Sequence, residues 1–245
     1  MTSVERTLRT LEHQLPDRVP VDLHNFLVTA RMMGVGSFAD FFRDGEAMAE
    51  GQIMAWRRFG YDVLLVENGT AALAEACGVQ VQYQSDSAPV AEEPAIQSLD
   101  EVDDLELPDP YTHPLLSELL KATRIVVGEK GVRLAYHICG NATPIVGDMV
   151  STGATIIEID QKADMRVCKE AARGRAALLG PIDPSGVMAN GTPESVTERC
   201  LEALEVLAPE GGFILGPGCA LPATAPDENM DALIESAKTH GRYLA

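Results

Sequence analysis

The sequence predicts an α/β fold, a TIM (β/α)8-type barrel shortened to about six strands, in a single domain over residues 1–245. Three observations lead to this prediction. Short apolar runs end in polar or Gly/Pro residues, helical stretches separate them, and most runs are continuously apolar. Continuously apolar strands are typical of a parallel sheet covered on both faces. Strands separated by single helices indicate βα units, so a barrel is favoured over an open doubly wound sheet.

Each predicted strand consists of a run of mostly apolar residues that ends in polar residues or glycine. They are residues 18–24, 61–67, 132–137, 154–160, 176–183 and 212–219. A different pattern, apolar and polar in alternation, predicts an exposed hairpin strand over residues 79–84.

Helices are expected between these strands, over residues 45–59, 115–131, 143–152, 165–174, 193–208 and 227–240. The best defined starts at Pro193, which suits the first helical position, with Thr192 as its N-cap. A closed barrel of this type needs eight strands. The sequence therefore predicts that two βα units are missing where the helix over 115–131 runs directly into the next strand.

Composition narrows the possible functions. Nineteen basic residues against 37 acidic ones give a net charge of -18, which disfavours nucleic acids and anionic membrane surfaces as partners. There is no apolar run of the ~18 residues that a membrane span requires, and residues 1–20 lack the apolar region of a signal peptide. We expect a cytoplasmic protein whose five cysteines are reduced and serve core, catalytic or metal-binding roles.

The clearest candidate site combines His137 and Cys139, at the end of one predicted strand, with Cys219 at the end of the last. The carboxyl ends of parallel strands in a barrel converge on one face. An imidazole and two thiolates form a zinc-type ligand set, and three protein ligands leave the open position of a catalytic site. On spacing alone, a core histidine and buried cysteines remain an equal alternative. The neighbouring glycine turns favour the metal site, because they allow close backbone approach.

Carboxylates end three other predicted strands, namely Glu67, Asp160 and Asp183. Each is a candidate catalytic residue, as a fourth ligand, a partner that orients His137, or a proton acceptor. The alternative for each is a cap on the following helix. Glu67 and Asp183 are the preferred pair.

His24 ends the first predicted strand and is a candidate substrate contact, with a surface histidine as its alternative. Asn141, in the turn after Cys139, is a second candidate for substrate binding. Cys77, Cys168 and Cys200 fall on predicted helices and are expected to pack in the core.

Two segments, Leu134-Ala-Tyr-His-Ile-Cys-Gly-Asn141 and Gly216-Pro-Gly-Cys-Ala-Leu-Pro222, resemble the uroporphyrinogen decarboxylase superfamily. The His-x-Cys and distant Cys pattern is similar to its zinc-dependent corrinoid methyltransferases, of the methylcobamide:coenzyme M methyltransferase type. This resemblance implies a barrel that lacks two central βα units, with His137, Cys139 and Cys219 on zinc. It also implies methyl transfer between a corrinoid (methylcobamide), carried by a partner protein, and a thiol, methoxy or methylamine compound.

Two other functions remain open. The first is a uroporphyrinogen decarboxylase of tetrapyrrole biosynthesis, whose arginine-rich N-terminal motif has no equivalent between Arg18 and Arg31. The second is a non-catalytic shortened barrel that binds a metal or a partner. Open strand edges at the missing units would need a cover, which predicts a possible homodimer.

Overall fold

The computed structural model describes residues 1–69, 71–84, 88–98, 100–101, 105–106, 108–127 and 135–243. The chain divides into two compact units. The first comprises Met1–His24, Trp56–Leu65 and Val132–Ala245, and the second comprises Asn25–Ala55 and Val66–Gly131. No helix in the described part of the chain is long and apolar enough to cross a membrane. The single domain expected over 1–245 stays a prediction.

The elements follow one another in the order α1 (Ser3–Leu11), α2 (Phe26–Met33), α3 (Phe38–Phe41), α4 (Gly45–Phe59), α5 (Ala72–Ala76), β1 (Gln80–Gln82), β2 (Val90–Glu93), α6 (Pro114–Val127), β3 (Ala135–His137), the 3-10 turn η2 (Thr143–Ile145), α7 (Val146–Ser151), β4 (Ile156–Glu158), α8 (Met165–Ala172), β5 (Ala177–Ile182), the π-helical turn η3 (Pro184–Ala189), α9 (Pro193–Leu207), β6 (Phe213–Pro217) and α10 (Asp227–His240).

The first unit is built on a parallel sheet in the order β3-β4-β5-β6. Parallel bridges from Val21 to Leu215 and from Asp22 to Val63 extend it beyond β6. The amide nitrogen of Leu215 donates to the carbonyl oxygen of Pro20 over 2.9 Å, and that of Val63 donates to the carbonyl oxygen of Val21 over 3.0 Å. The six predicted strands thus lie side by side and parallel, the first two as single bridges.

The α/β class and the parallel arrangement are confirmed, but no closed barrel is found among the described residues. Closure of such a sheet needs eight strands, and these residues supply six positions. Residues 132–134 of one predicted strand and 128–131 of the helix before it lie outside the described part of the chain.

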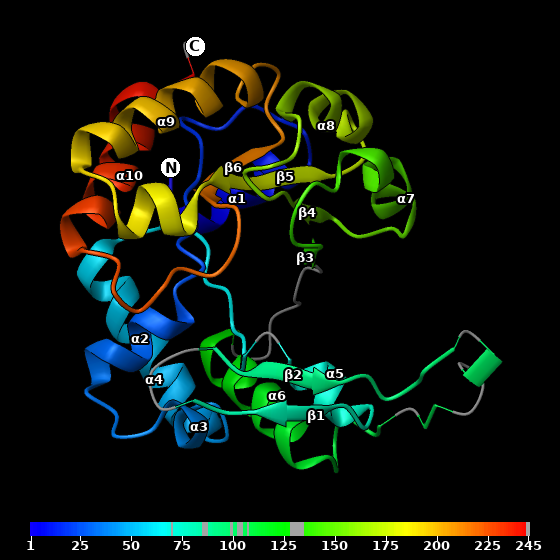
Figure 1. Cartoon of the computed structure of the whole chain (residues 1–245). Coiled ribbons are helices and arrows are strands. Elements are labelled where there is room, and N and C mark those ends of the chain that lie inside the picture. The colour runs from blue at the N-terminus through cyan, green and yellow to red at the C-terminus, as the bar shows by residue number, and fades with distance from the viewer. Residues whose placement is uncertain are drawn as a thin grey trace. The chain divides into compact units, whose positions relative to one another are not determined.

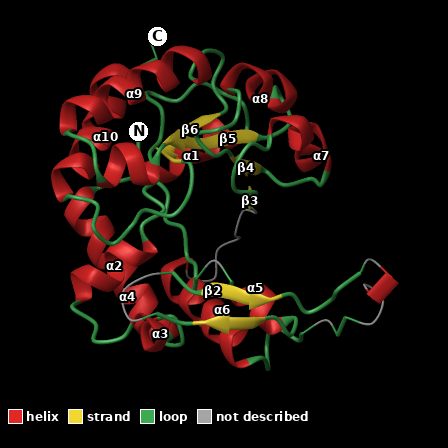
Figure 2. Cartoon of the chain, viewed as in Figure 1, coloured by secondary structure: helices red, strands yellow, loops and turns green. Residues whose placement is uncertain are grey.

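Helices α7, α8, α9 and α10 form an arc around this sheet (Figures 1 and 2). Helix α9 starts as predicted, with Thr192 as N-cap and Pro193 in the first turn. It buries a stripe at helical spacing, which consists of Val196, Cys200, Ala203, Leu204 and Leu207. This stripe explains its packing against β5, β6, α8 and α10. Strand β5 is buried at all six residues, as its continuous apolar run predicts.

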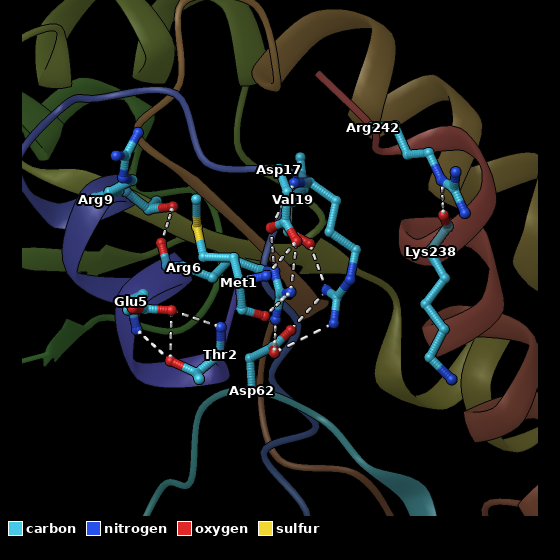
Figure 3. Close-up of polar contacts among 12 residues, drawn as sticks. Met1, Thr2, Glu5, Arg6, Arg9, Asp17, Val19, Asp62, Lys238 and Arg242 are labelled. Carbon is cyan, nitrogen blue, oxygen red and sulfur yellow. Dashed lines mark hydrogen bonds and ion pairs between the residues drawn. The ribbon is translucent and has the colours of Figure 1, made fainter. Parts of the chain in front are cut away.

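An ion-pair network centred on the buried carboxylate of Asp62 anchors the amino-terminal segment to this sheet (Figure 3). Arg6 of α1 donates to Asp17 over 2.7 Å and to Asp62 over 2.6 Å. Arg18 donates to the same Asp62 carboxylate over 2.6 Å. Asp62 also accepts the amide of Val21 over 3.1 Å, so one carboxylate joins α1 to the first two strand positions.

The second unit holds α2, α3, α5, α6, the antiparallel pair β1-β2 and most of α4. The pairing of β1 with β2 confirms the hairpin strand expected over 79–84. The aromatic packing of the second unit centres on Phe42. Its ring centroid lies 5.5 Å from that of Phe26 and 5.7 Å from that of Phe41. Helix α6, over Pro114–Val127, confirms the predicted helix in this region.

Candidate metal centre

His137, Cys139 and Cys219 come together at the carboxyl ends of the parallel strands. The Nε2 atom of His137 lies 3.1 Å from Sγ of Cys139, which lies 3.6 Å from Sγ of Cys219. All three ligand atoms lie within 4.8 Å of one another. A flat sheet would separate β3 from β6 by roughly 14 Å. The three ligand atoms lie far closer than this, so they meet over the ends of β4 and β5 rather than each above its own strand.

The other ring nitrogen of His137 fixes its tautomer. Nδ1 lies 3.2 Å from the carbonyl oxygen of Glu158. A carbonyl oxygen can only accept, so Nδ1 carries the hydrogen in this bond and Nε2 keeps its lone pair. That lone pair is the one directed toward the thiols, as in metal-binding histidines generally.

Asp160 holds the loop that carries Cys139. Its Oδ2 accepts the amide of Gly140 over 2.8 Å, and its Oδ1 accepts the amide of Lys162 over 3.0 Å. Gly140 has a φ of 85°, a conformation that glycine adopts without strain. The structure therefore ties this sequence-predicted carboxylate directly to a candidate ligand loop.

Two buried acids behind the cluster were not singled out from the sequence. Glu158, in β4, is 2% exposed and its Oε1 lies 2.6 Å from Nδ1 of His24. Asp22 is fully buried and its Oδ2 accepts the amide of His24 over 2.9 Å. The available signal was a carboxylate between apolar neighbours inside a predicted strand, because an acid that is buried there needs a partner.

Burial sets the electrostatics of these groups. Burial, with a smaller contribution from the nearby charge of Glu158, raises the pKa of Asp22 to about 7 against the opposing charge of His24. Burial also raises the pKa of the Cys219 thiol, with a second contribution from the charge of Cys139. A metal cation would have to displace the proton of Cys219, so binding would release protons.

The side chains of two other candidates accept local main-chain hydrogen bonds. Oδ1 of Asp183 accepts the amides of Ser185 over 2.9 Å and Gly186 over 2.8 Å, which is the cap geometry of η3. Oδ1 of Asn141 accepts the amide of Thr143 over 3.2 Å, also in a turn. The catalytic and binding roles of these two residues stay predictions.

Glu67 and His24 have different surroundings. Glu67 is half-buried and belongs to the second unit. His24 is only 5% exposed, so it is not the surface histidine considered as its alternative. The roles assigned to both from the sequence stay predictions.

The other cysteines divide into two groups. Cys168 and Cys200 are fully buried, as predicted, and burial raises their thiol pKa values to about 11 and about 12. Cys77 is only half-buried, so its predicted place in the core is wrong. It follows the last residue of the short helix α5, where the chain turns toward β1.

Comparison with known proteins gives one family. The profile of the uroporphyrinogen decarboxylase (URO-D) family matches residues 2–134 and 126–240. These two matches meet in the region where the sequence predicts the missing βα units.

Among curated proteins, the chain is similar to the methylcobamide:CoM methyltransferase MtbA of Methanosarcina acetivorans, with 32% identity over 130 residues. This match covers 53% of the chain and 36% of that protein. The methylcobamide:CoM methyltransferase MtaA of Methanosarcina barkeri is 30% identical over 133 residues, which cover 54% of the chain and 37% of that protein. A uroporphyrinogen decarboxylase of Magnetococcus marinus is 29% identical over 99 residues, which cover 40% of the chain and 27% of that protein. Each of these matches spans little more than a third of the relative, or less.

A solved structure shows the same fold. A methyltransferase from Methanosarcina mazei superimposes with a TM-score of 0.72 over 98% of this chain and 99% of that chain, at 17% identity. At this identity the match concerns the fold alone.

Proposed function

Because the chain belongs to the uroporphyrinogen decarboxylase family, we propose that it is a zinc-dependent methyltransferase of that family. The methyl group that it transfers would pass between a corrinoid carried by a partner protein and a small thiol, methoxy or methylamine compound. The resemblance to MtbA and MtaA supports this class of reaction. The observation that carries the proposal is the cluster of His137, Cys139 and Cys219.

The residues of this cluster fit a zinc ion. One imidazole nitrogen and two sulfur atoms are ligands that zinc prefers, and three protein ligands leave one position for substrate. The hydrogen bond from Nδ1 of His137 to Glu158 leaves the correct nitrogen, Nε2, for a metal. Cys139 is exposed and Cys219 half-buried, so a small substrate can approach the sulfurs from solvent.

Zinc bound by these three residues would supply a Lewis acid that favours the thiolate form of a bound thiol. Other residues of the chain hold and orient the three ligands. Asp160 fixes the Cys139 loop through the amide of Gly140, while its other oxygen accepts the amide of Lys162 in its own turn. The carbonyl oxygen of Glu158 fixes the His137 ring. Asp160 and Asp183, which belong to the same unit as the cluster, are the candidate acceptors for the proton that the thiol loses.

In the thiol-methylating direction, the sulfur of the thiolate forms a bond to the methyl carbon. The bond between that carbon and the carrier breaks, and its electron pair stays on the carrier. A methyl group on a carrier protein must reach the sulfurs from outside, which agrees with the exposure of Cys139. A large corrinoid partner is therefore compatible with the position of the cluster.

Decarboxylation is the second candidate, because uroporphyrinogen decarboxylases also match part of the chain. Its substrate carries several carboxylates and would need cationic side chains. The contacts described for the cluster are instead with acids, because His137 lies against Glu158 and Asp160 accepts the amide that follows Cys139. This surrounding favours methyl transfer.

Elemental mass spectrometry of the purified chain tests the proposal. We expect about one zinc per chain, lost in the Cys139→Ser/Cys219→Ser double variant and kept in a Cys77→Ser control, which lies in the second unit. The zinc-loaded chain should then methylate small thiols with methylcobalamin as donor. A folded chain that binds no zinc when zinc is supplied would overturn the proposal and favour the decarboxylase or non-catalytic alternatives.

A further inference from the structure

We propose that His24 is a positioning residue: through the Glu158 carboxylate it holds the ring of His137 so that Nε2 faces the two thiols. This inference rests on the proposed function only in its consequence for zinc affinity. The orientation of His137 is a property of the chain itself and can be measured without metal.

The contacts form a chain of three side chains, in which His24 and Glu158 are buried and His137 is half-buried. Nδ1 of His24 lies 2.6 Å from Oε1 of Glu158, and Oε2 of the same carboxylate lies 3.8 Å from Nδ1 of His137. The His24 and Glu158 side chains are 6% and 2% exposed. The two imidazole rings meet edge to face at 6.4 Å, with an interplanar angle of 86°. Glu158 thus stands between two imidazoles, and His24 occupies the oxygen that does not face His137.

The backbone of His24 is held in an unusual conformation that directs its side chain toward Glu158. Its φ is 42°, in the left-handed region that non-glycine residues seldom adopt. Two hydrogen bonds hold this conformation: the His24 amide donates to Oδ2 of Asp22 over 2.9 Å, and the Leu221 amide donates to the His24 carbonyl over 3.0 Å. Such outliers persist only where surrounding structure imposes them. Asp22 and Leu221 therefore direct the His24 side chain inward, toward Glu158.

This geometry assigns His24 a role different from substrate binding. A side chain this buried, with Nδ1 engaged by a carboxylate, acts on Glu158. Without the hydrogen bond from His24, the Glu158 carboxylate could rotate away from His137. Of the two contacts that Glu158 makes with the ring, only the bond from Nδ1 to the Glu158 carbonyl would then remain. Removal of partners that orient a ligand histidine typically weakens metal binding about 10- to 100-fold.

Two pairs of matched variants test this role. His24→Asn keeps an N–H donor close to the position of Nδ1 and tolerates a left-handed backbone, whereas His24→Phe keeps a ring and removes the donor. Glu158→Gln keeps an oxygen acceptor, whereas Glu158→Met has similar length and none. Zinc affinity, measured by chelator competition, should fall about 10- to 100-fold in His24→Phe and Glu158→Met. In His24→Asn and Glu158→Gln it should fall much less.

A double variant shows whether His24 acts through Glu158. If it does, His24→Phe/Glu158→Met binds zinc no more weakly than Glu158→Met alone. Absorption spectra of the cobalt-substituted chains should change together in the two donor-free variants and stay near wild type in the conservative ones. Multiplied losses in the double variant, or equal losses in both members of each pair, would overturn the inference.

Nitrogen NMR of the metal-free chain separates this inference from the proposed function. The His137 ring should carry its hydrogen on Nδ1 in the wild type, and the other tautomer should gain population in His24→Phe and Glu158→Met. This result in a chain that never binds zinc would support the inference and overturn the proposed function. Normal zinc binding with no change of tautomer or affinity in any variant would do the reverse. Melting temperatures of all four variants identify any that fail to fold, in which case the other pair decides.

Discussion

Gly218 and Ile159 lie in such close contact that there is no room for a side chain at position 218. A Cβ added to Gly218 would stand 2.8 Å from the carbonyl oxygen of Ile159 and 2.9 Å from the amide nitrogen of Gln161. The amide of Gly218 also donates to the carbonyl oxygen of Ile182 over 2.8 Å. Because Cys219 follows directly, this approach of the chain after β6 to the chain after β4 fixes the position of a candidate zinc ligand.

We expect Gly218→Ala to weaken zinc binding at least about tenfold, because the clash involves backbone atoms and must displace Cys219. The overpacking should also lower the free energy of unfolding by about 1–3 kcal/mol. Gly147→Ala is the matched control: its Cβ would meet nothing within 4 Å and it lies inside α7. That variant should be neutral or more stable by up to about 1 kcal/mol. Chelator competition and urea unfolding measure both effects, and unchanged zinc affinity in Gly218→Ala would contradict the explanation.

The network around Asp62 predicts a contrast between two acids (Figure 3). The Asp62 side chain is 0% exposed and pairs with Arg6 and Arg18, whereas the Asp17 side chain is 41% exposed. Removal of one partner from a buried pair costs about 3–5 kcal/mol, because the remaining charge stays buried. Exposed pairs contribute about 0–1 kcal/mol. Asp62→Asn should therefore destabilise the chain far more than Asp17→Asn in urea unfolding, and equal losses would contradict this contrast.

The fold was predictable where a single physical pattern dominated. The run over β5 is buried at every residue, so continuous apolarity was a sufficient signal. The predicted strand over 61–67 was less accurate, because only Val63 forms a bridge there. Asp62 in this segment is instead committed to the two arginines. Helix α1 was missed because it is polar on most of its surface; its capping box, Thr2 with Glu5, was the available signal.

The ligand cluster was predictable because its residues end strands that converge in this fold. His137 and Cys219 each follow an apolar run, which is where barrel sites form. Glu158 and Asp22 were not predictable in the same way. Glu158 pairs with His24, 134 residues away along the chain, and sequence spacing does not show such a pair. Asp22 accepts the amide of His24, only two residues on, but the sequence pattern does not show that the Asp22 carboxyl is fully buried.

Asp160 should matter for zinc binding more than Asp183, although both accept two main-chain amides. Asp160 uses one oxygen for each amide, so Asp160→Asn places an NH2 group against an N–H donor. Asp183 uses the single atom Oδ1 for both, so Asp183→Asn can keep both bonds. We expect Asp160→Asn to lose about 1–3 kcal/mol of stability and to bind zinc more weakly. Asp183→Asn should change neither property, and the reverse order would show that the Cys139 loop does not depend on Asp160.

Asp22 predicts a dependence of stability on pH. The pKa of Asp22 is raised from 3.8 to about 7, mainly by burial and to a lesser degree by the charge of Glu158, against the opposing charge of His24. Between these two pH values the folded chain keeps the proton that the unfolded chain has already lost. A rise in pH therefore stabilises the unfolded state relative to the folded state. The free energy of unfolding falls by up to about 1.4 kcal/mol per pH unit.

Asp22→Asn removes this titration and keeps an oxygen that can accept the amide of His24. The variant should therefore gain stability relative to wild type as pH rises from about 4 to about 7, by at most on the order of 4 kcal/mol in total. Asp17→Asn is the opposite control, because Arg6 lowers the pKa of Asp17 to about 2. The stability that Asp17 contributes is present above its unfolded pKa, near 4, and is lost as pH falls toward 2. Urea unfolding of the three chains at pH 3, 4, 5, 6, 7 and 8 measures both trends. Parallel curves for wild type and Asp22→Asn from pH 4 to pH 8 would show that the Asp22 carboxyl does not hold its proton in the folded chain.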